Sequence, residues 1–102
     1  MALESFSKQP YEEFVISGDF VNVLVTGETL VLATSTVTAA DTDGADATST
    51  VLDATTKAVD GTKLQMRCKA GSTGSKYKIT FRGVTDQDNK WEIDVWMKVK
   101  EL

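Results

Sequence analysis

Few side chains in this sequence could carry out acid–base or nucleophilic chemistry. Histidine, which most often transfers protons near neutral pH and binds zinc, is absent. Cys68 is the one cysteine, and its alternation with Leu64 and Met66 predicts a buried thiol with a structural role. No feature of the sequence selects an acid and base pair from its carboxylates. We therefore expect neither enzymatic activity nor a bound cofactor.

Two loops have a partial likeness to ion-binding motifs. In Asp41–Asp46 the glycine is fourth, whereas the EF-hand calcium loop needs it sixth, and Leu52 occupies the position of that loop's glutamate. A calcium site of another geometry and a solvated acidic loop both remain open here. Gly71–Lys76 lacks the spacing of a phosphate-binding loop, and a strand is expected to follow it in place of a helix. The sequence therefore assigns no metal ligand and no nucleotide site.

Trp96 breaks the pattern of its surroundings, because its neighbours two positions away, Asp94 and Lys98, are charged. An exposed tryptophan here would anchor a protein contact. Alternatively, a loop, an N-terminal arm or the aliphatic stem of a lysine or arginine covers the ring. Both readings remain open. Leu3 and Phe6, the apolar residues of an otherwise polar N-terminal segment, are the other candidate interface residues.

Period-two alternation predicts the strands that would position these side chains. It is clearest in Lys90–Glu101, Lys76–Thr85 and Thr62–Lys69, and the turn-forming run Asp86–Asn89 predicts a hairpin between the first two. The residues expected to face inward are Trp91, Ile93, Val95, Met97, Val99, Tyr77, Ile79, Phe81, Leu64, Met66 and Cys68. Tyr77 follows a glycine-containing connection, and we expect its hydroxyl to bind upstream backbone, as in the tyrosine corner of β-sandwiches.

Other segments give weaker signals. The β-branched run Thr29–Ala39, together with Ala47–Leu52 and Phe14–Ile16, is expected to form strands, the last at an edge behind Pro10. Asp41–Asp46 and Asp53–Gly61 are expected to be loops. For Asp19–Leu24, a helical turn capped by Asp19 and an irregular segment remain open.

Together these elements predict an all-β fold. We expect an immunoglobulin-like β-sandwich of about six or seven antiparallel strands. The 102 residues suit one domain, assigned to residues 11–102, with residues 1–10 as a flexible N-terminal arm.

The charge balance narrows the class of partner. With a formal net charge of −4 and a pI near 4.7, the chain should repel phosphate backbones and anionic lipid surfaces, so neither nucleic acid nor membrane is expected as a partner. No apolar stretch approaches the length of a membrane helix. The first ten residues do not resemble a secretory signal, so we expect the chain to stay in the cytoplasm where it is made.

Four segments, in order, carry a resemblance to a known family. They are Ile16–Phe20 (ISGDF), Thr26–Leu30 (TGETL), Gly74–Arg82 (GSKYKITFR) and Trp91–Val95 (WEIDV). Together they resemble short tailed-phage virion proteins with an immunoglobulin-like sandwich, sometimes described as fibre-tail adaptors. The resemblance covers roughly residues 12–100.

The resemblance implies a structural role in a bacteriophage virion, as an adaptor, connector or decoration subunit at the neck, collar, tail or capsid surface. Its partners would be other virion proteins and copies of itself, assembled in the host cytoplasm. It implies no catalytic residue. The alternative is a carbohydrate-binding or adhesion module, because sandwiches also display sugar sites on loops or aromatic faces.

Overall fold

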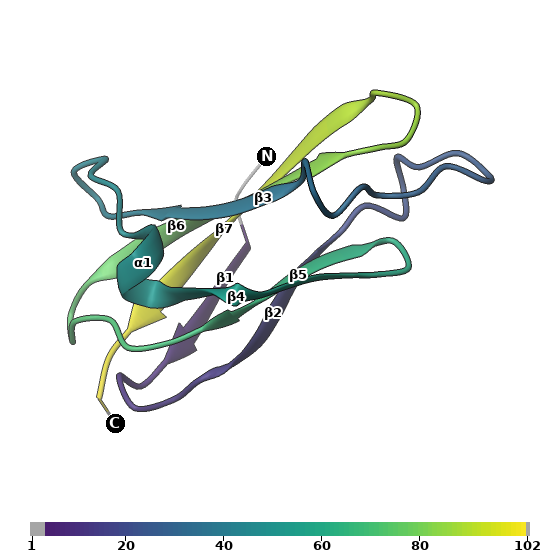
Figure 1. The fold of residues 1–102 in the computed structure, drawn as a ribbon. Helices are drawn as coiled ribbons and strands as arrows, with labels where there is room; N and C mark the ends of the chain where they lie inside the picture. Colours follow the sequence, from purple (N-terminus) through teal and green to yellow (C-terminus); the bar gives the residue numbers. More distant parts are fainter. Residues whose placement is uncertain (1–3, 102) are drawn as a thin grey trace.

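Seven β-strands and one short helix occupy the residues that the computed structural model describes, 4–101 (Figure 1). The elements are β1 (Glu4–Lys8), β2 (Phe14–Asp19), β3 (Thr36–Ala40), α1 (Thr48–Val51), β4 (Leu52–Asp60), β5 (Lys63–Cys68), β6 (Lys76–Val84) and β7 (Lys90–Val99). The fold is all-β, as the sequence predicts. Within residues 4–101, no helix has the length and hydrophobicity needed to cross a membrane.

The strands form two sheets. The four-stranded sheet has the order β1-β7-β6-β3, and the three-stranded sheet has the order β2-β5-β4. Figure 1 shows the sheets as two layers, with the β6–β7 hairpin projecting beyond them. Neighbouring strands are antiparallel except β1 and β7, which are parallel. The expectation of antiparallel pairing throughout is therefore wrong at β1.

The core lies between the sheets and is built from the rows that alternation predicts. Leu64, Met66 and Cys68 of β5 are buried, as are Tyr77, Ile79 and Phe81 of β6 and Met97 and Val99 of β7. Gly18 of β2 lies against Phe81, where an added Cβ would come within 2.8 Å of the ring. Trp91 does not follow the prediction of an inward, covered side chain. It is 40% exposed, because it lies at the hairpin end of β7.

Residues 4–10 do not form the loose arm that the sequence suggests. Glu4–Lys8 is a strand that pairs in register with Glu4 opposite Val95 and Lys8 opposite Val99. Lys8 is only 2% exposed, and its ammonium group donates hydrogen bonds to the carbonyl oxygens of Pro10 and Ala70. The apolar stem of the lysine is thereby buried while its charged end keeps polar partners.

Three further expectations are corrected. Asp53–Gly61 is largely strand β4 and not a loop, with a register shift between Asp53 and Ala58. Ala47–Leu52 contains helix α1 in place of a strand. Of Thr29–Ala39, only Thr36 onward is strand, because the backbone turns at Val31–Ser35, where the Ser35 amide donates to the Val31 carbonyl.

Two local predictions agree with the structure. The Tyr77 hydroxyl accepts a hydrogen bond from the backbone amide of Ser72, 3.1 Å away. The question left open at Asp19–Leu24 resolves to one turn. The amides of Val23 and Leu24 donate to the Phe20 carbonyl, and the Asp19 carboxylate accepts from the Val21 amide.

Candidate protein-interaction surface

Trp96 lies on the outer face of the four-stranded sheet. It pairs with Ser5 of β1 on one side and Lys78 of β6 on the other. Its ring is half-buried, and the Lys76 ammonium group sits 4.9 Å from the ring centroid. The reading in which a lysine covers the ring therefore holds in part, because Lys76 of the neighbouring strand lies over it. The rest of the ring is exposed, and its role as an anchor of a protein contact remains a prediction.

Three lysines surround Trp96 without neutralising partners. Lys76 and Lys98 are directly opposite each other on β6 and β7, and Lys78 is opposite Trp96. Like charges facing each other across a strand pair destabilise a sheet. The ion pair among residues 4–101 is Arg82 with Glu92, further along the same face, so none of the three lysines has a carboxylate within 4.0 Å there. We call Trp96, Lys76, Lys78 and Lys98 the tryptophan–lysine face.

Phe6 and Leu3 have different outcomes. Phe6 is half-buried against the core, and its ring meets that of Phe14 edge-to-face with centroids 5.9 Å apart. This contact joins β1 of one sheet to β2 of the other. Phe6 thus packs within the sandwich, and a role for it at an interface remains a prediction. Leu3 lies outside the described residues.

The edge of β1 next to the tryptophan–lysine face is open. The Lys8 carbonyl accepts from the Lys100 amide, so the backbone groups of Lys8 face β7. Because these directions alternate along a strand, the N–H and C=O groups of Ser5 and Ser7 point away from β7. No strand of residues 4–101 lies on that side of β1. The backbone N–H and C=O groups of the two serines therefore have no strand to pair with among residues 4–101.

A hollow of about 190 Å³ opens between β1 and β2 beneath this edge. Its lining includes the apolar side chains of Phe6, Ile16, Phe81 and Val95, and the polar residues Glu4, Ser5 and Ser17 also contribute. The hollow lies where the two sheets come together at their β1 and β2 edges. Its size suits one aliphatic side chain.

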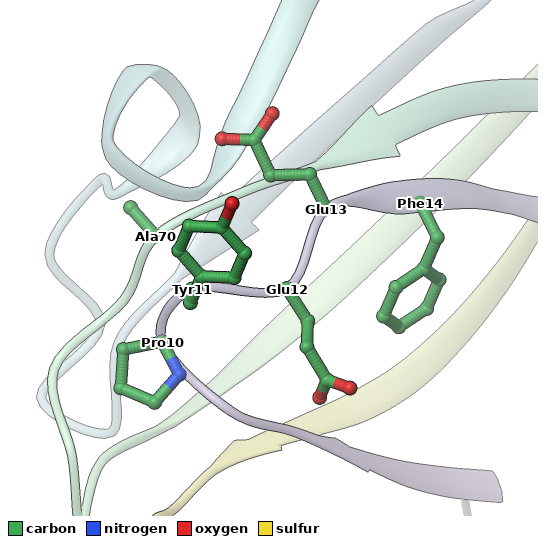
Figure 2. Close-up of a pocket in the computed structure, with 6 residues that line it drawn as sticks. All are labelled: Pro10, Tyr11, Glu12, Glu13, Phe14 and Ala70. Carbon is green, nitrogen blue, oxygen red and sulfur yellow. The ribbon is translucent and has the colours of Figure 1, made fainter.

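Sequence reasoning missed Tyr11, which is 96% exposed. It lies in the β1–β2 connection beside a shallow hollow of about 740 Å³, lined by Pro10, Tyr11, Glu12, Glu13, Phe14 and Ala70. Figure 2 shows the side chains of Glu12 and Glu13 pointing to different sides of this connection, so they form no carboxylate pair. The signal in the sequence that could have identified Tyr11 is an aromatic residue within a polar run that shows no period-two alternation.

The described residues contain no candidate metal centre. Within residues 4–101, no group of three or more histidine, cysteine, aspartate or glutamate side chains could hold a metal ion. In the Asp41–Asp46 loop, the Asp41 carboxylate instead accepts from the amides of Asp43 and Ala45. Cys68 is fully buried, as predicted, and burial raises the pKa of its thiol, which disfavours the reactive thiolate.

Comparison with known proteins adds no relative: no protein-family model, no curated protein and no solved structure matches this chain. The structural indications of function are therefore the tryptophan–lysine face and the open β1 edge.

Proposed function

We propose that this chain is a structural protein of a bacteriophage virion and acts by binding neighbouring proteins. It would serve as an adaptor, connector or decoration subunit at the neck, collar, tail or capsid surface, after assembly in the host cytoplasm. The observation that carries the binding role is Trp96, half-buried among unneutralised lysines on the outer face of the four-stranded sheet. Tryptophan is enriched at protein-binding hot spots, and an open strand edge beside it adds backbone contacts.

The strand order supports an immunoglobulin-like sandwich. The orders β2-β5-β4 and β3-β6-β7 correspond to strands B-E-D and C-F-G of immunoglobulin domains. The hydrogen bond from the Ser72 amide to the Tyr77 hydroxyl matches a tyrosine corner at the start of strand F. Such a fold hosts many functions, so the proposal rests on the surface and on the sequence resemblance rather than on the fold.

Incorporation into phage particles tests the proposal. Host cells that express the tagged wild-type protein, Trp96→Ala or Trp91→Ala are infected with a phage that lacks this gene. The particles are then purified and analysed by mass spectrometry. We expect wild type and Trp91→Ala in the particles and a strong loss of Trp96→Ala. Trp91 is a matched control because it lies on the same strand and is exposed on the opposite face. Absence of the wild-type protein from particles would reject the virion role.

Trp91 supports the alternative function, a carbohydrate-binding or adhesion module. Its ring lines a hollow of about 400 Å³ together with Arg82, Lys90 and Glu92, which supply polar groups for hydroxyls. Sugar sites normally gather several rings on one surface, however, and Trp91 and Trp96 lie on opposite faces of β7, with Tyr11 on the β1–β2 connection. Binding on a glycan panel that Trp91→Ala removes and Trp96→Ala leaves intact would favour this alternative.

A further inference from the structure

The partner of the tryptophan–lysine face can be specified by its chemistry. We propose that an extended, acidic polypeptide segment binds here and adds a fifth strand to the four-stranded sheet at the open edge of β1. The inference rests on the proposed function, because it names the class of partner for that same surface. Three features define the segment: its backbone, its outward side chains and its inward side chains.

The backbone requirement comes from β1. The N–H and C=O groups of Ser5 and Ser7 face away from β7, and β1 carries neither a proline nor a register shift that would block pairing. The other edge of this sheet is covered at Ala39. At β3, the Ala39 carbonyl accepts from the Ala47 amide, and the Ala39 amide donates to the Thr48 hydroxyl. The β1 edge is therefore the more open of the two edges at which this sheet can extend.

The outward side chains of the added strand should be acidic. They would lie beside Ser5 and Ser7, whose short side chains leave the approach to Trp96 and Lys98 open. Neighbouring strands are about 5 Å apart, so the added strand lies about 10 Å from β7, within the combined reach of glutamate and lysine side chains. A glutamate there would neutralise Lys98 and relieve its repulsion with Lys76 across the strand pair.

The inward side chains should be aliphatic. Alternate residues of the added strand would face the hollow of about 190 Å³ lined by Phe6, Ile16, Phe81 and Val95. Filling it removes apolar surface from water. The partner segment is thus one in which acidic and aliphatic residues alternate. A sheet edge with unpaired backbone favours a polypeptide over an acidic glycan, which has no strand backbone to pair.

Peptide binding to the purified protein provides the first test. The probe is a fluorescent synthetic peptide in which glutamate and valine alternate over about eight residues, within the usual length of a strand. We expect binding by fluorescence anisotropy that is at least about tenfold tighter than for a lysine–valine peptide. A glutamate–valine peptide with methylated backbone nitrogens on its pairing side should not bind. Equal binding of the methylated peptide, or binding of a sulfated oligosaccharide alone, would overturn strand addition.

Two proline variants locate the edge. Ser7→Pro removes an N–H that points to the open side of β1, so pairing with β7 is retained while the added strand loses its partner. Val15→Pro is the control on β2 and lies outside the hollow. The backbone N–H groups of odd-numbered β2 residues point away from β5, because the Phe20 amide donates to the Thr62 carbonyl. We expect Ser7→Pro to abolish peptide binding and Val15→Pro to preserve it. The reverse result would contradict the assignment to β1.

Lys98→Glu separates binding from folding. The variant places a carboxylate opposite Lys76, so its melting temperature should stay level or rise while peptide affinity falls by about tenfold or more. Unchanged affinity would contradict the acidic partner.

The same variants in the particle assay keep the two proposals distinguishable. If Trp96→Ala is excluded from particles while Ser7→Pro and Lys98→Glu are incorporated normally, strand addition fails and the virion role stands. If the peptide binds as expected but the wild-type protein is absent from particles, the virion role fails and strand addition stands.

Discussion

Lys8 shows how one residue can hold an edge strand in place. Its side chain occupies the core-facing row of β1, where an ammonium group without partners would be costly. The carbonyl oxygens of Pro10 and Ala70 accept hydrogen bonds from this ammonium group, and Ala70 belongs to the connection between β5 and β6. The lysine thereby ties β1 to a distant loop as well as to β7.

Replacing this group tests its contribution to stability. Lys8→Met keeps the apolar stem but leaves the Ala70 carbonyl without its donor, so the free energy of unfolding should fall by about 1–3 kcal/mol. Urea denaturation followed by tryptophan fluorescence measures the change. Lys90→Met, at an exposed position on β7, is the control and should stay close to wild type. If the free energy of unfolding of Lys8→Met equals that of the control, solvent satisfies the two carbonyls in place of the lysine.

The alternation that predicted three inner rows did not reveal Lys8. In sequence it stands in a polar run with Ser7 and Gln9, where a lysine is normally solvated. Its burial depends on pairing with Val99, a residue at the other end of the chain. Trp96 was easier to find, because it departs from a pattern that its own strand establishes. The opposition of Lys76 and Lys98 needed the register of β6 on β7, which residue spacing alone does not fix.

At the scale of elements, Glu28 fastens the segment between β2 and β3 to the β6–β7 hairpin. Its carboxylate accepts hydrogen bonds from the Thr85 hydroxyl, the Asn89 side-chain amide and the Val25 backbone amide. These bonds lower the pKa of Glu28 below its ordinary value of 4.5, and the bond from Thr85 has the largest effect.

The lowered pKa makes this connection sensitive to acid. Because the pKa of Glu28 is lower in the folded state, its ionised form stabilises the fold above pH 4.5, and this stabilisation is lost as the pH falls through the folded-state pKa. The melting temperature of Glu28→Gln should therefore lie below that of wild type at pH 7, and the gap should close in acid. Differential scanning fluorimetry from pH 7 down into acid measures this gap in melting temperature. Glu13→Gln, at an exposed position, is the control. A gap that stays constant with pH would contradict this role.

Elements with regular alternation were predictable, and those shaped by distant contacts were not. In β5, β6 and β7 the period of two is intact, so the buried rows follow directly. In β4 the register shift between Asp53 and Ala58 breaks the period, and the run of Thr, Lys and Asp resembles a loop. Helix α1 spans four residues, which is too few to show helical periodicity. Hydrogen bonds of Ala47 and Thr48 join this segment to β3.

At the scale of the whole molecule, the strands differ in how firmly they are held. β6 is a nine-residue strand between β7 and β3, with Ile79 and Phe81 fully buried. β1 has five residues and, within residues 4–101, one neighbouring strand, with which its pairing is parallel. A short edge strand with few neighbours opens locally at a lower free energy than the centre of a sheet. This order matters for function, because the edge that opens most easily is the one proposed to receive a partner.

Hydrogen exchange measured residue by residue by NMR can test this order. The amides of Phe6 and Lys8, which face β7, should exchange faster than those of Ile79 and Phe81, because the former need only β1 to detach whereas the latter need the sandwich to open. Lys8→Met should accelerate the β1 amides by a larger factor than those of β6, since it removes a contact specific to β1. The glutamate–valine peptide should slow the β1 amides again, because an added strand would hold β1 from its open side. If β1 and β6 amides exchange at one common rate in the free protein, β1 opens only with the whole fold, and the bound segment must then dock on a rigid edge.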